Sequence, residues 1–296
     1  GPGDEVLLSD HEYGACKFAF QFAAKKRGFA VVEQSIPLPV ESNAGIVDAF
    51  WRGVTPGTKL IFISHITSAT ALALPVAEIC QRARDAGILT MVDGAHAPGQ
   101  IDVDLGDIGA DFYTATCHKW MCAPKGSGVF YAREDRQHLV EPLVVGWGWG
   151  EEKTIHRENE FLEHHEWLGT HDPSAYLPVP AALAWQKTNI TPEVRQRSRD
   201  LVRLAVERAS EIEGIERVHP DAFAYQMGLI DVTSRQVDRD VLKSWLYDTH
   251  RIEVPVIRWR DRTFIRVSAH AYTTQADIEA LVQALQSPAF PAPARR

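Results

Sequence analysis

Short apolar runs alternate with helical patterns along the first 133 residues of the chain. Each run is rich in β-branched or aromatic residues and is bounded by turn residues, as is typical of buried strands. This alternation predicts an α/β fold with a mainly parallel sheet covered by helices on both faces. The six predicted strands lie at residues 6–9, 30–34, 60–64, 88–92, 112–115 and 128–132.

The pattern changes after residue 133. Residues 134–180 are rich in Gly, Trp and His, and a loop of this length is more often functional than filler. Helical patterns at 174–187 and 192–212 then lead into alternating β and α segments that end in a helix at 275–285. We predict three parts: a large domain at 1–188, a smaller C-terminal α+β domain at 189–286 and a flexible Pro-rich tail at 287–296.

Composition narrows the class of protein. A chain of 296 residues with 45% hydrophobic content fits one large domain and one smaller one. The formal net charge of -8, without a basic stripe, argues against nucleic acid as a partner. Four irregularly spaced cysteines favour a reducing compartment, and no apolar run approaches the roughly 20 residues of a membrane span. We therefore expect a cytoplasmic protein with no membrane partner.

Polar clusters follow four of the predicted strands. Because ligands bind at the carboxyl ends of strands in such sheets, these clusters are expected to meet in one crevice. They are residues 10–13, 65–68, 93–96 and 116–119.

Two of these clusters carry a pair of residues with distinctive chemistry. Asp93 and Lys119 follow neighbouring strands, and each alone is common as a turn residue or a surface charge. Together they suit pyridoxal 5′-phosphate (PLP), since a Lys amine forms a Schiff base with its aldehyde and a carboxylate keeps its pyridine nitrogen protonated. The sequence therefore predicts a PLP site at this sheet edge.

The surrounding motifs support this interpretation. The segments 92–99 (VDGAHAPG), 110–113 (ADFY) and 118–120 (HKW) resemble the PLP-binding signature of the class V aminotransferase family, and the similarity continues to the RVSAHAY segment at 266–272. The resemblance implies PLP fold type I. Within the family, the DHEYGA opening at 10–15 and the EWLGTHD segment at 166–172 are most similar to isopenicillin N epimerase-like proteins.

The resemblance also implies roles for single residues around the cofactor. Lys119 would carry PLP, Asp93 would pair with its pyridine nitrogen, and His96 would hydrogen-bond its phenolic oxygen. Thr116 and His118 would hold the phosphate. Tyr13 would stack on the pyridine face, where an aromatic plane fixes the tilt of the ring.

The resemblance also covers three further positions, which are Ser68, Thr170 and Arg266. Ser68 stands where many members carry an Asn to the phenolic oxygen, and its hydroxyl is shorter. Thr170 matches a Thr that reaches the phosphate of a neighbouring subunit, which implies a homodimer with shared active sites; a helix-capping role is the alternative. Arg266 matches the residue that grips the substrate carboxylate. Histidines 164, 165 and 171 match no metal-ligand spacing, so we expect no metal and place them near the substrate mouth.

The reaction is the least determined part of the prediction. No Cys lies between Arg251 and Arg266, where a cysteine desulfurase needs its thiolate. We expect a PLP enzyme that acts at the α-carbon of an amino acid or amino-acid-containing substrate, as an epimerase or racemase or as an aminotransferase. A C–S β-lyase or a desulfurase-like enzyme is an alternative.

A truncated, non-catalytic homologue is the alternative from a different functional class. The Gly1-Pro2-Gly3-Asp4 turn leads directly into an apolar run, which looks like the middle of an α/β repeat. The large domain is therefore predicted to be N-terminally incomplete, without the phosphate-binding turn that family members carry earlier in the chain.

Overall fold

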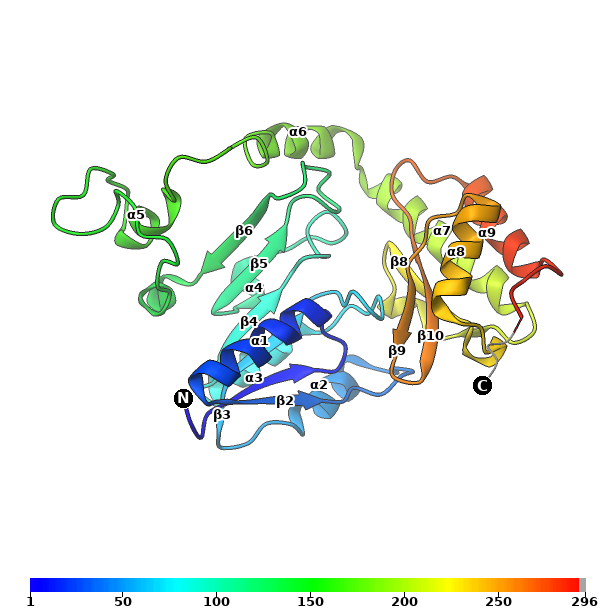
Figure 1. Ribbon diagram of the computed structural model, residues 1–296, viewed down its shortest axis with the longest axis horizontal. Helices are drawn as coiled ribbons and strands as arrows, with labels where there is room; N and C mark the ends of the chain where they lie inside the picture. Colours follow the sequence, from blue (N-terminus) through cyan, green and yellow to red (C-terminus); the bar gives the residue numbers. More distant parts are fainter. Residues whose placement is uncertain (293–296) are drawn as a thin grey trace.

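The computed structural model describes residues 1–292 and contains two sheets, linked along the chain through helix α6 (Val179–Asn189) (Figure 1). The larger sheet has the order β2-β1-β3-β4-β5-β6. Its first five strands pair in parallel and only β6 is antiparallel. Its strands are β1 (Glu5–Ser9), β2 (Ala30–Gln34), β3 (Thr58–Ser64), β4 (Leu89–Asp93), β5 (Phe112–Thr116) and β6 (Gly128–Ala132). The predicted α/β fold and all six predicted strands are confirmed.

Helices lie on both faces of this large sheet, as predicted. They are α1 (Gly14–Arg27), α2 (Asn43–Trp51), α3 (Val76–Asp85) and α4 (Leu105–Ile108). The main core packs the sheet against α2, α3 and α4, and a smaller cluster on the other face packs Val6, Leu8 and Phe62 against α1. The sequence predicts helices of ten or more residues between these strands, whereas α2 and α4 have nine and four residues.

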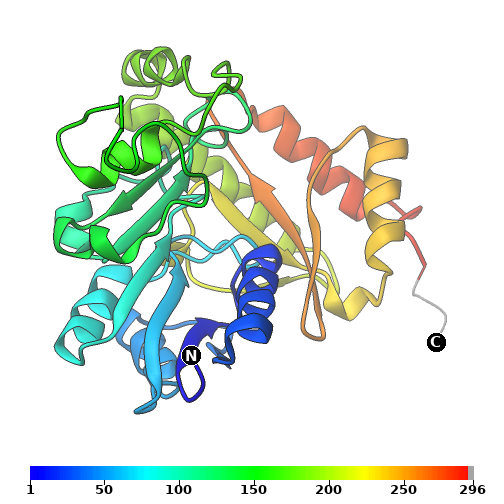
Figure 2. The same cartoon turned by 60° about the vertical axis from the view of Figure 1, so that its left-hand side comes forward.

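The segment between the sheets is more ordered than the sequence predicts. It contains a 3-10 helix (Glu134–Leu139) and helix α5 (Glu160–Glu166), which begins where Asn159 accepts the backbone N–H of Leu162 at 2.9 Å. Seven residues are too few for a clear apolar period, which explains why the sequence pattern did not reveal α5. Figures 1 and 2 show this segment, residues 133–178, hereafter the arm, beyond β6 and on the far side of the large sheet from β10 (Arg262–Ser268).

The smaller sheet is antiparallel, in the order β7-β8-β10-β9, and packs against three helices. The predicted boundary between residues 188 and 189 falls at the end of α6, whose last residue is Asn189, and stays a prediction. The elements are α7 (Pro192–Ser210), β7 (Glu216–Arg217), 3-10 helices at Asp221–Phe223 and Thr233–Arg235, β8 (Met227–Asp231), α8 (Arg239–His250), β9 (Val256–Trp259), β10 (Arg262–Ser268) and α9 (Gln275–Gln286).

The predicted flexible tail begins with an ordered contact. The Phe290 ring lies 5.6 Å from the Trp245 ring, and the Arg235 guanidinium lies 4.0 Å from the Phe290 ring centre. The last part of that tail, residues 293–296, lies outside the described residues. Within residues 1–292, no helix is both long and apolar enough to cross a bilayer.

The two sheets meet at the carboxyl ends of the parallel strands. The Trp259 indole donates to the Asp10 carbonyl oxygen at 3.0 Å, and Arg260 forms an ion pair with the Asp10 carboxylate. A buried cluster at the same junction includes Trp120 from the large sheet and Phe264 from β10. This junction positions the candidate site.

Candidate active site

A pocket of about 290 Å³ lies where the loops after β4 and β5 face β10. Two of the four polar clusters predicted at strand ends contribute to its wall. The polar and aromatic residues that line it include His96, His118 and Lys119 from the large sheet and Arg266, His270 and Tyr272 from the β10 side.

Lys119 supplies a primary amine to this pocket. It follows β5 by three residues, and its Nζ lies 3.4 Å from His96 Nε2. Burial lowers the pKa of Lys119; the Asp93 carboxylate opposes this shift and the Arg266 charge adds to it. A lowered pKa increases the fraction of neutral amine, which is the nucleophilic and basic form.

Asp93 is a buried carboxyl group at the end of β4. Its Oδ1 accepts the Ala95 backbone N–H at 2.8 Å, and its Oδ2 lies 3.8 Å from the Cys16 thiol. Burial and the nearby carboxylates raise the pKa of Cys16 to about 11, so the thiol stays protonated and acts as a weak donor to Asp93. These contacts orient the Asp93 carboxyl group.

His96 lies in the loop after β4 and is buried. Its Nδ1 accepts the Trp120 indole N–H at 3.1 Å, while its Nε2 faces Lys119. Burial lowers the pKa of His96 to about 3, and the positive charges of Lys119 and Arg266 add to this effect. The imidazole is therefore neutral at physiological pH.

The loop after β1 is fixed by buried polar side chains. Asp10 accepts the Ile36 backbone N–H at 2.9 Å, and His11 Nε2 lies 2.7 Å from the Ile36 carbonyl oxygen. Tyr13 follows at the N-cap of α1, and the residue is 54% exposed. The structure does not place Tyr13 among the residues that line the pocket of this chain.

Glu12 is a second buried carboxyl group close to Asp93. It accepts hydrogen bonds from the hydroxyls of Ser9 and Ser64. Burial raises the pKa of Glu12 to about 7, the two hydroxyls lower it in part, and the Asp93 charge raises it further. The sequence motif contained Glu12 without indicating this burial.

Arg266 reaches across the junction from β10 to the loop after β3. Its Nη1 donates to the Ser68 carbonyl oxygen and, at 3.0 Å, to the Ser68 hydroxyl. Burial lowers the pKa of Arg266, although a guanidinium stays charged in proteins. Its buried Nε has no hydrogen-bond partner within residues 1–292. Ser68 thus contacts Arg266, and the guanidinium keeps a buried donor for another acceptor.

Thr116 and His118, the predicted phosphate ligands, each form a hydrogen bond with a backbone carbonyl oxygen. The Thr116 hydroxyl donates to the Ala95 carbonyl oxygen at 3.0 Å, and His118 Nδ1 lies 3.0 Å from the Ser127 carbonyl oxygen. A carbonyl oxygen only accepts, so His118 Nδ1 carries a proton. His118 lines the pocket, whereas Thr116 does not.

The arm carries a further predicted residue that does not line this pocket. Thr170 is exposed in the segment between α5 and α6. Neither it nor His164, His165 or His171 lines the pocket, and the expectation that these histidines lie near the substrate mouth stays a prediction. Within residues 1–292, no three His, Cys, Asp or Glu side chains gather as a metal site.

Three aromatic side chains form a wall that the sequence analysis did not predict. The Trp120 and His270 rings stack with centroids 5.8 Å apart, and the His270 and Tyr272 rings stack at 5.2 Å. All three residues belong to the motifs at 118–120 and 266–272. Their place in these motifs is the signal by which the sequence could have indicated them as site residues.

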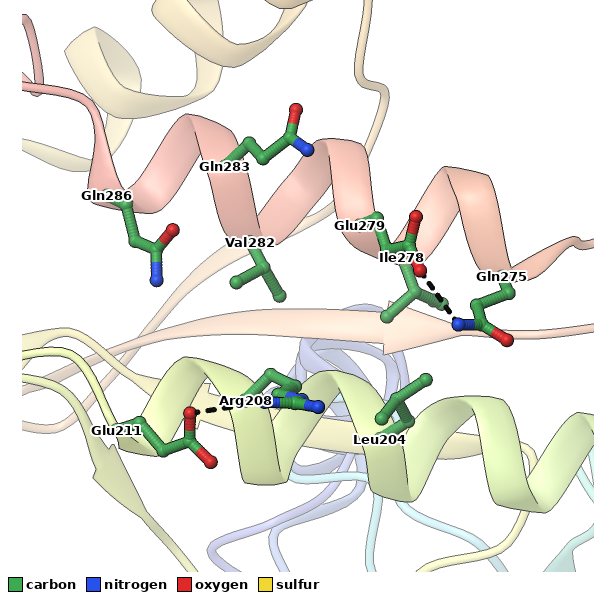
Figure 3. Close-up of a pocket in the computed structure, with 9 residues that line it drawn as sticks. All are labelled: Leu204, Arg208, Glu211, Gln275, Ile278, Glu279, Val282, Gln283 and Gln286. Atoms are coloured by element: carbon green, nitrogen blue, oxygen red, sulfur yellow. Dashed lines mark hydrogen bonds and ion pairs between the residues drawn. The ribbon is translucent and has the colours of Figure 1, made fainter.

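A separate groove of about 270 Å³ lies between α7 and α9 (Figure 3). Its polar side chains include two internal pairs, Arg208 with Glu211 at 3.6 Å and Gln275 with Glu279 at 2.7 Å. The nine residues that line it include no Lys, His, Cys or Ser. This groove therefore lacks the chemistry of the pocket beside Lys119.

Known sequences are similar to this one over nearly the whole chain. The family model for class-V aminotransferases matches residues 1–281. Isopenicillin N epimerases from Amycolatopsis lactamdurans and Streptomyces clavuligerus are 35% and 33% identical, covering 96% and 97% of this chain and 74% of each relative. A probable chloroplastic L-cysteine desulfhydrase from Arabidopsis thaliana is 34% identical over 61% of this chain and 38% of its own length.

Solved structures show the same fold at lower identity. The cystine C–S lyase C-DES, in complex with its product cysteine persulfide, has a TM-score of 0.81 and 24% identity, covering 96% of this chain and 75% of that one. The cysteine desulfurase CsdA from Escherichia coli has a TM-score of 0.79 and 22% identity, covering 96% and 72%. One structure of C-DES contains a PLP cofactor.

The donor set of the pocket fits PLP. Its walls carry the Lys119 amine, the neutral His96 imidazole and Arg266 with its buried Nε. The buried Asp93 carboxyl group lies outside this lining, at the end of the neighbouring strand β4, and is close enough to Lys119 to act on its charge. These groups match an aldehyde, a pyridine nitrogen, a phenolic oxygen and a substrate carboxylate. From the matched family and the fitting donor set we conclude that the chain belongs to the class V aminotransferase family and that PLP is its cofactor.

Proposed function

We propose that this protein acts at the α-carbon of an amino acid or amino-acid-containing substrate, as an epimerase or racemase. The observation that carries the proposal is the presence of Lys119 and Arg266 on facing walls of one pocket. An amine of lowered pKa can move the α-proton, and a guanidinium can hold the α-carboxylate. The 35% and 33% identical isopenicillin N epimerases support an α-carbon epimerisation.

The residues around Lys119 suit the cofactor. PLP, when bound, supplies an electron-accepting ring that stabilises negative charge at the substrate α-carbon. Asp93 would hold the pyridine nitrogen in its protonated form, because a carboxylate favours the charged state of its partner. His96 would contact the phenolic oxygen, Thr116 and His118 would hold the phosphate, and Tyr13 would cover the ring.

Lys119 would exchange the proton on one face of the α-carbon. Its lowered pKa favours the neutral amine needed to accept that proton, and the resulting ammonium can return it. Inversion also requires a group on the other face, and Tyr13 is our candidate because the residue is exposed beyond the anchored loop.

Arg266 and Ser68 would orient the substrate. The Ser68 hydroxyl and carbonyl fix one end of the guanidinium, and the buried Nε remains as a donor. A fixed planar guanidinium binds a carboxylate with two parallel hydrogen bonds, which also sets the direction of the α-carbon.

A C–S β-lyase is the second candidate function, because plant L-cysteine desulfhydrases are among the relatives. A desulfurase that uses a protein thiolate is less well supported. Burial raises the pKa of Cys122, and raises the pKa of Cys16 to about 11, so both thiols stay protonated.

We also propose a homodimer in which a second copy covers β6 and the arm. Large apolar side chains are exposed there, among them Phe130, Leu143, Trp147 and Trp149. Exposed apolar surface of this kind marks an interaction site. A partner's arm would bring its own Thr170 towards the phosphate, a role that Thr170 cannot fill within one chain.

Substrate turnover in deuterated water tests the proposed function. The protein with PLP is incubated with amino acids of either chirality and followed by proton NMR and chiral chromatography. An epimerase incorporates deuterium at the α-carbon and forms the other enantiomer, and Lys119→Ala abolishes both. Accumulation of a keto acid would establish transamination instead, sulfide release would establish the lyase, and no turnover would favour a non-catalytic homologue.

A further inference from the structure

Trp120 makes the one side-chain contact to the Nδ1 atom of His96 that the described residues provide. Its indole Nε1 lies 3.1 Å from Nδ1, and both residues are 7% exposed. An indole N–H only donates, so Nδ1 must accept and cannot carry a proton. The proton of the neutral imidazole therefore belongs on Nε2.

The second ring nitrogen faces the reacting groups. His96 Nε2 lies 3.4 Å from Lys119 Nζ on the wall of the pocket. With its proton on Nε2, the ring donates towards the Lys119 amine. It would likewise donate to an oxygen of a cofactor attached to that amine, and it is unable to accept a proton there.

The opposite tautomer would place two donors face to face. The buried indole N–H would then lose its acceptor, and a buried unsatisfied donor costs free energy. One net hydrogen bond of ordinary strength corresponds to about a tenfold preference for the Nε2–H form.

Trp120 is itself held from several directions. Its carbonyl oxygen accepts from the Gln186 amide and from His270 Nε2 at 3.3 Å, and its ring stacks on His270. The Gly99 backbone approaches so closely that an added Cβ would lie 2.6 Å from the Trp120 carbonyl oxygen. The indole is therefore fixed by the segment after β10, by α6 and by the loop after β4.

We propose that Trp120 is a positioning residue that fixes His96 as the Nε2–H tautomer, so that His96 acts as a hydrogen-bond donor to the group held at Lys119. The inference rests on the proposed role of His96 beside the phenolic oxygen. It explains why an aromatic residue with an N–H group follows Lys119 directly.

The tautomer is measurable in the protein without any reaction. Histidine ring nitrogens with and without a proton have well-separated 15N chemical shifts, and His96→Gln assigns the signals among the 12 histidines. In 15N-histidine-labelled wild type we expect His96 to carry its proton on Nε2. In Trp120→Phe, which keeps an aromatic ring but loses the N–H, the ratio of Nε2–H to Nδ1–H should fall about tenfold.

Trp259→Phe is the matched control. Trp259 is 8% exposed and donates to the Asp10 carbonyl oxygen at 3.0 Å, so its loss removes a buried indole hydrogen bond without touching His96. We expect the His96 ratio to stay at the wild-type value. An equal fall in both variants would mean that general loosening of the junction sets the tautomer, and would overturn the proposal.

The wild-type spectrum alone tests which nitrogen of His96 carries the proton, even if Trp120→Phe fails to fold. A proton on His96 Nδ1 in wild type would overturn the inference, as would an unchanged ratio in a folded Trp120→Phe. Because no substrate is used, an inactive protein with the Nε2–H form would refute the proposed function and leave this inference intact.

Discussion

Burial sets the charge of the titratable side chains around the pocket. It raises the pKa of Glu12 to about 7 and lowers the pKa of His96 to about 3, so each group favours its neutral form. Such pKa shifts make the stability of the fold depend on pH, because in the unfolded chain the same groups have pKa values near their ordinary ones. Glu12 gives the clearer test, since it lies behind Asp93 and has an isosteric neutral substitute.

We predict that Glu12→Gln removes a pH dependence of stability. Glu12 has a folded pKa of about 7, raised by burial from 4.5, so the folded state holds a proton that the unfolded state releases. Its contribution to stability is present below pH 4.5 and declines as pH rises through 7. The wild type should lose about 3 kcal/mol relative to Glu12→Gln over this window. Denaturant unfolding at several pH values measures it, and parallel curves for the two proteins would refute the buried proton.

Arg266 gives a prediction about substrate binding. Arg266→Gln removes the charge that would hold the α-carboxylate, so its KM should rise about 100-fold. In Arg266→Lys the KM should rise about tenfold, because the charge is kept but the planar pair of donors is lost. Steady-state kinetics with a turned-over amino acid measures both values. Ser68→Ala is the control that keeps the guanidinium, and it should change KM least. A KM unchanged in Arg266→Gln would remove Arg266 from the substrate site.

Residue chemistry explains which of these side chains the sequence could reveal. Lys119 and Asp93 could be predicted because their types and their places after strands suffice. The roles of Glu12 and Trp120 depend on hydrogen bonds to Ser64 and His96, which lie 52 and 24 residues away in sequence. Such pairings are set by tertiary structure, so no local pattern indicates them.

The loop after β1 and the turn between β9 and β10 form one of the polar contacts between the two sheets. Asp10 is bonded to Arg260 and to the Trp259 indole, and the His11 ring lies 4.7 Å from the Trp259 ring. Arg260 has a φ of 54°, in the left-handed region, which turns the chain so that its guanidinium meets Asp10. The two elements together hold β10, and hence Arg266, against the pocket.

We predict that Arg260→Gln destabilises the fold by about 1–2 kcal/mol, because it leaves the buried Asp10 carboxylate without its cation. Thermal or denaturant unfolding measures the loss. Arg239→Gln is the control, since its ion pair with Asp240 is exposed and should change stability by less than about 0.5 kcal/mol. Equal effects in both variants would show that the contact between the sheets contributes nothing specific.

Prediction of elements succeeded where periodicity was strong. The six strands of the large sheet are short apolar runs bounded by turns, and each matches a predicted strand. The order within the antiparallel small sheet and the existence of α5 were not predicted. Pairing order depends on contacts between distant segments, and α5 is stabilised by its Asn159 cap and by the ion pair of Glu163 with Lys153.

At the scale of the whole molecule, apolar side chains gather on one end of the large sheet. Val129 and Phe130 on β6 are 51% and 45% exposed, and Leu143 and Trp147 in the following arm are 102% and 63% exposed. This surface supports the proposed homodimer, because a second copy would bury it and bring Thr170 to a neighbouring site.

Charged substitutions on this surface test the homodimer. Leu143→Asp combined with Trp147→Asp should convert a dimer into a monomer, because charges would be buried in an apolar interface. Analytical ultracentrifugation measures the mass. Tyr247→Asp on α8, which is 52% exposed at the opposite end of the molecule, should leave the dimer intact. A wild type that sediments as a monomer would refute the proposed assembly.

Lys119 is expected to hold PLP covalently in the pocket between the two sheets. The absorption spectrum of the purified protein with added PLP tests this attachment, for wild type, Lys119→Ala and the surface control Lys187→Ala on α6. We expect a long-wavelength band of covalently held cofactor in wild type and in Lys187→Ala, and its loss in Lys119→Ala. A band that persists in Lys119→Ala, or that is missing from all three proteins, would contradict it.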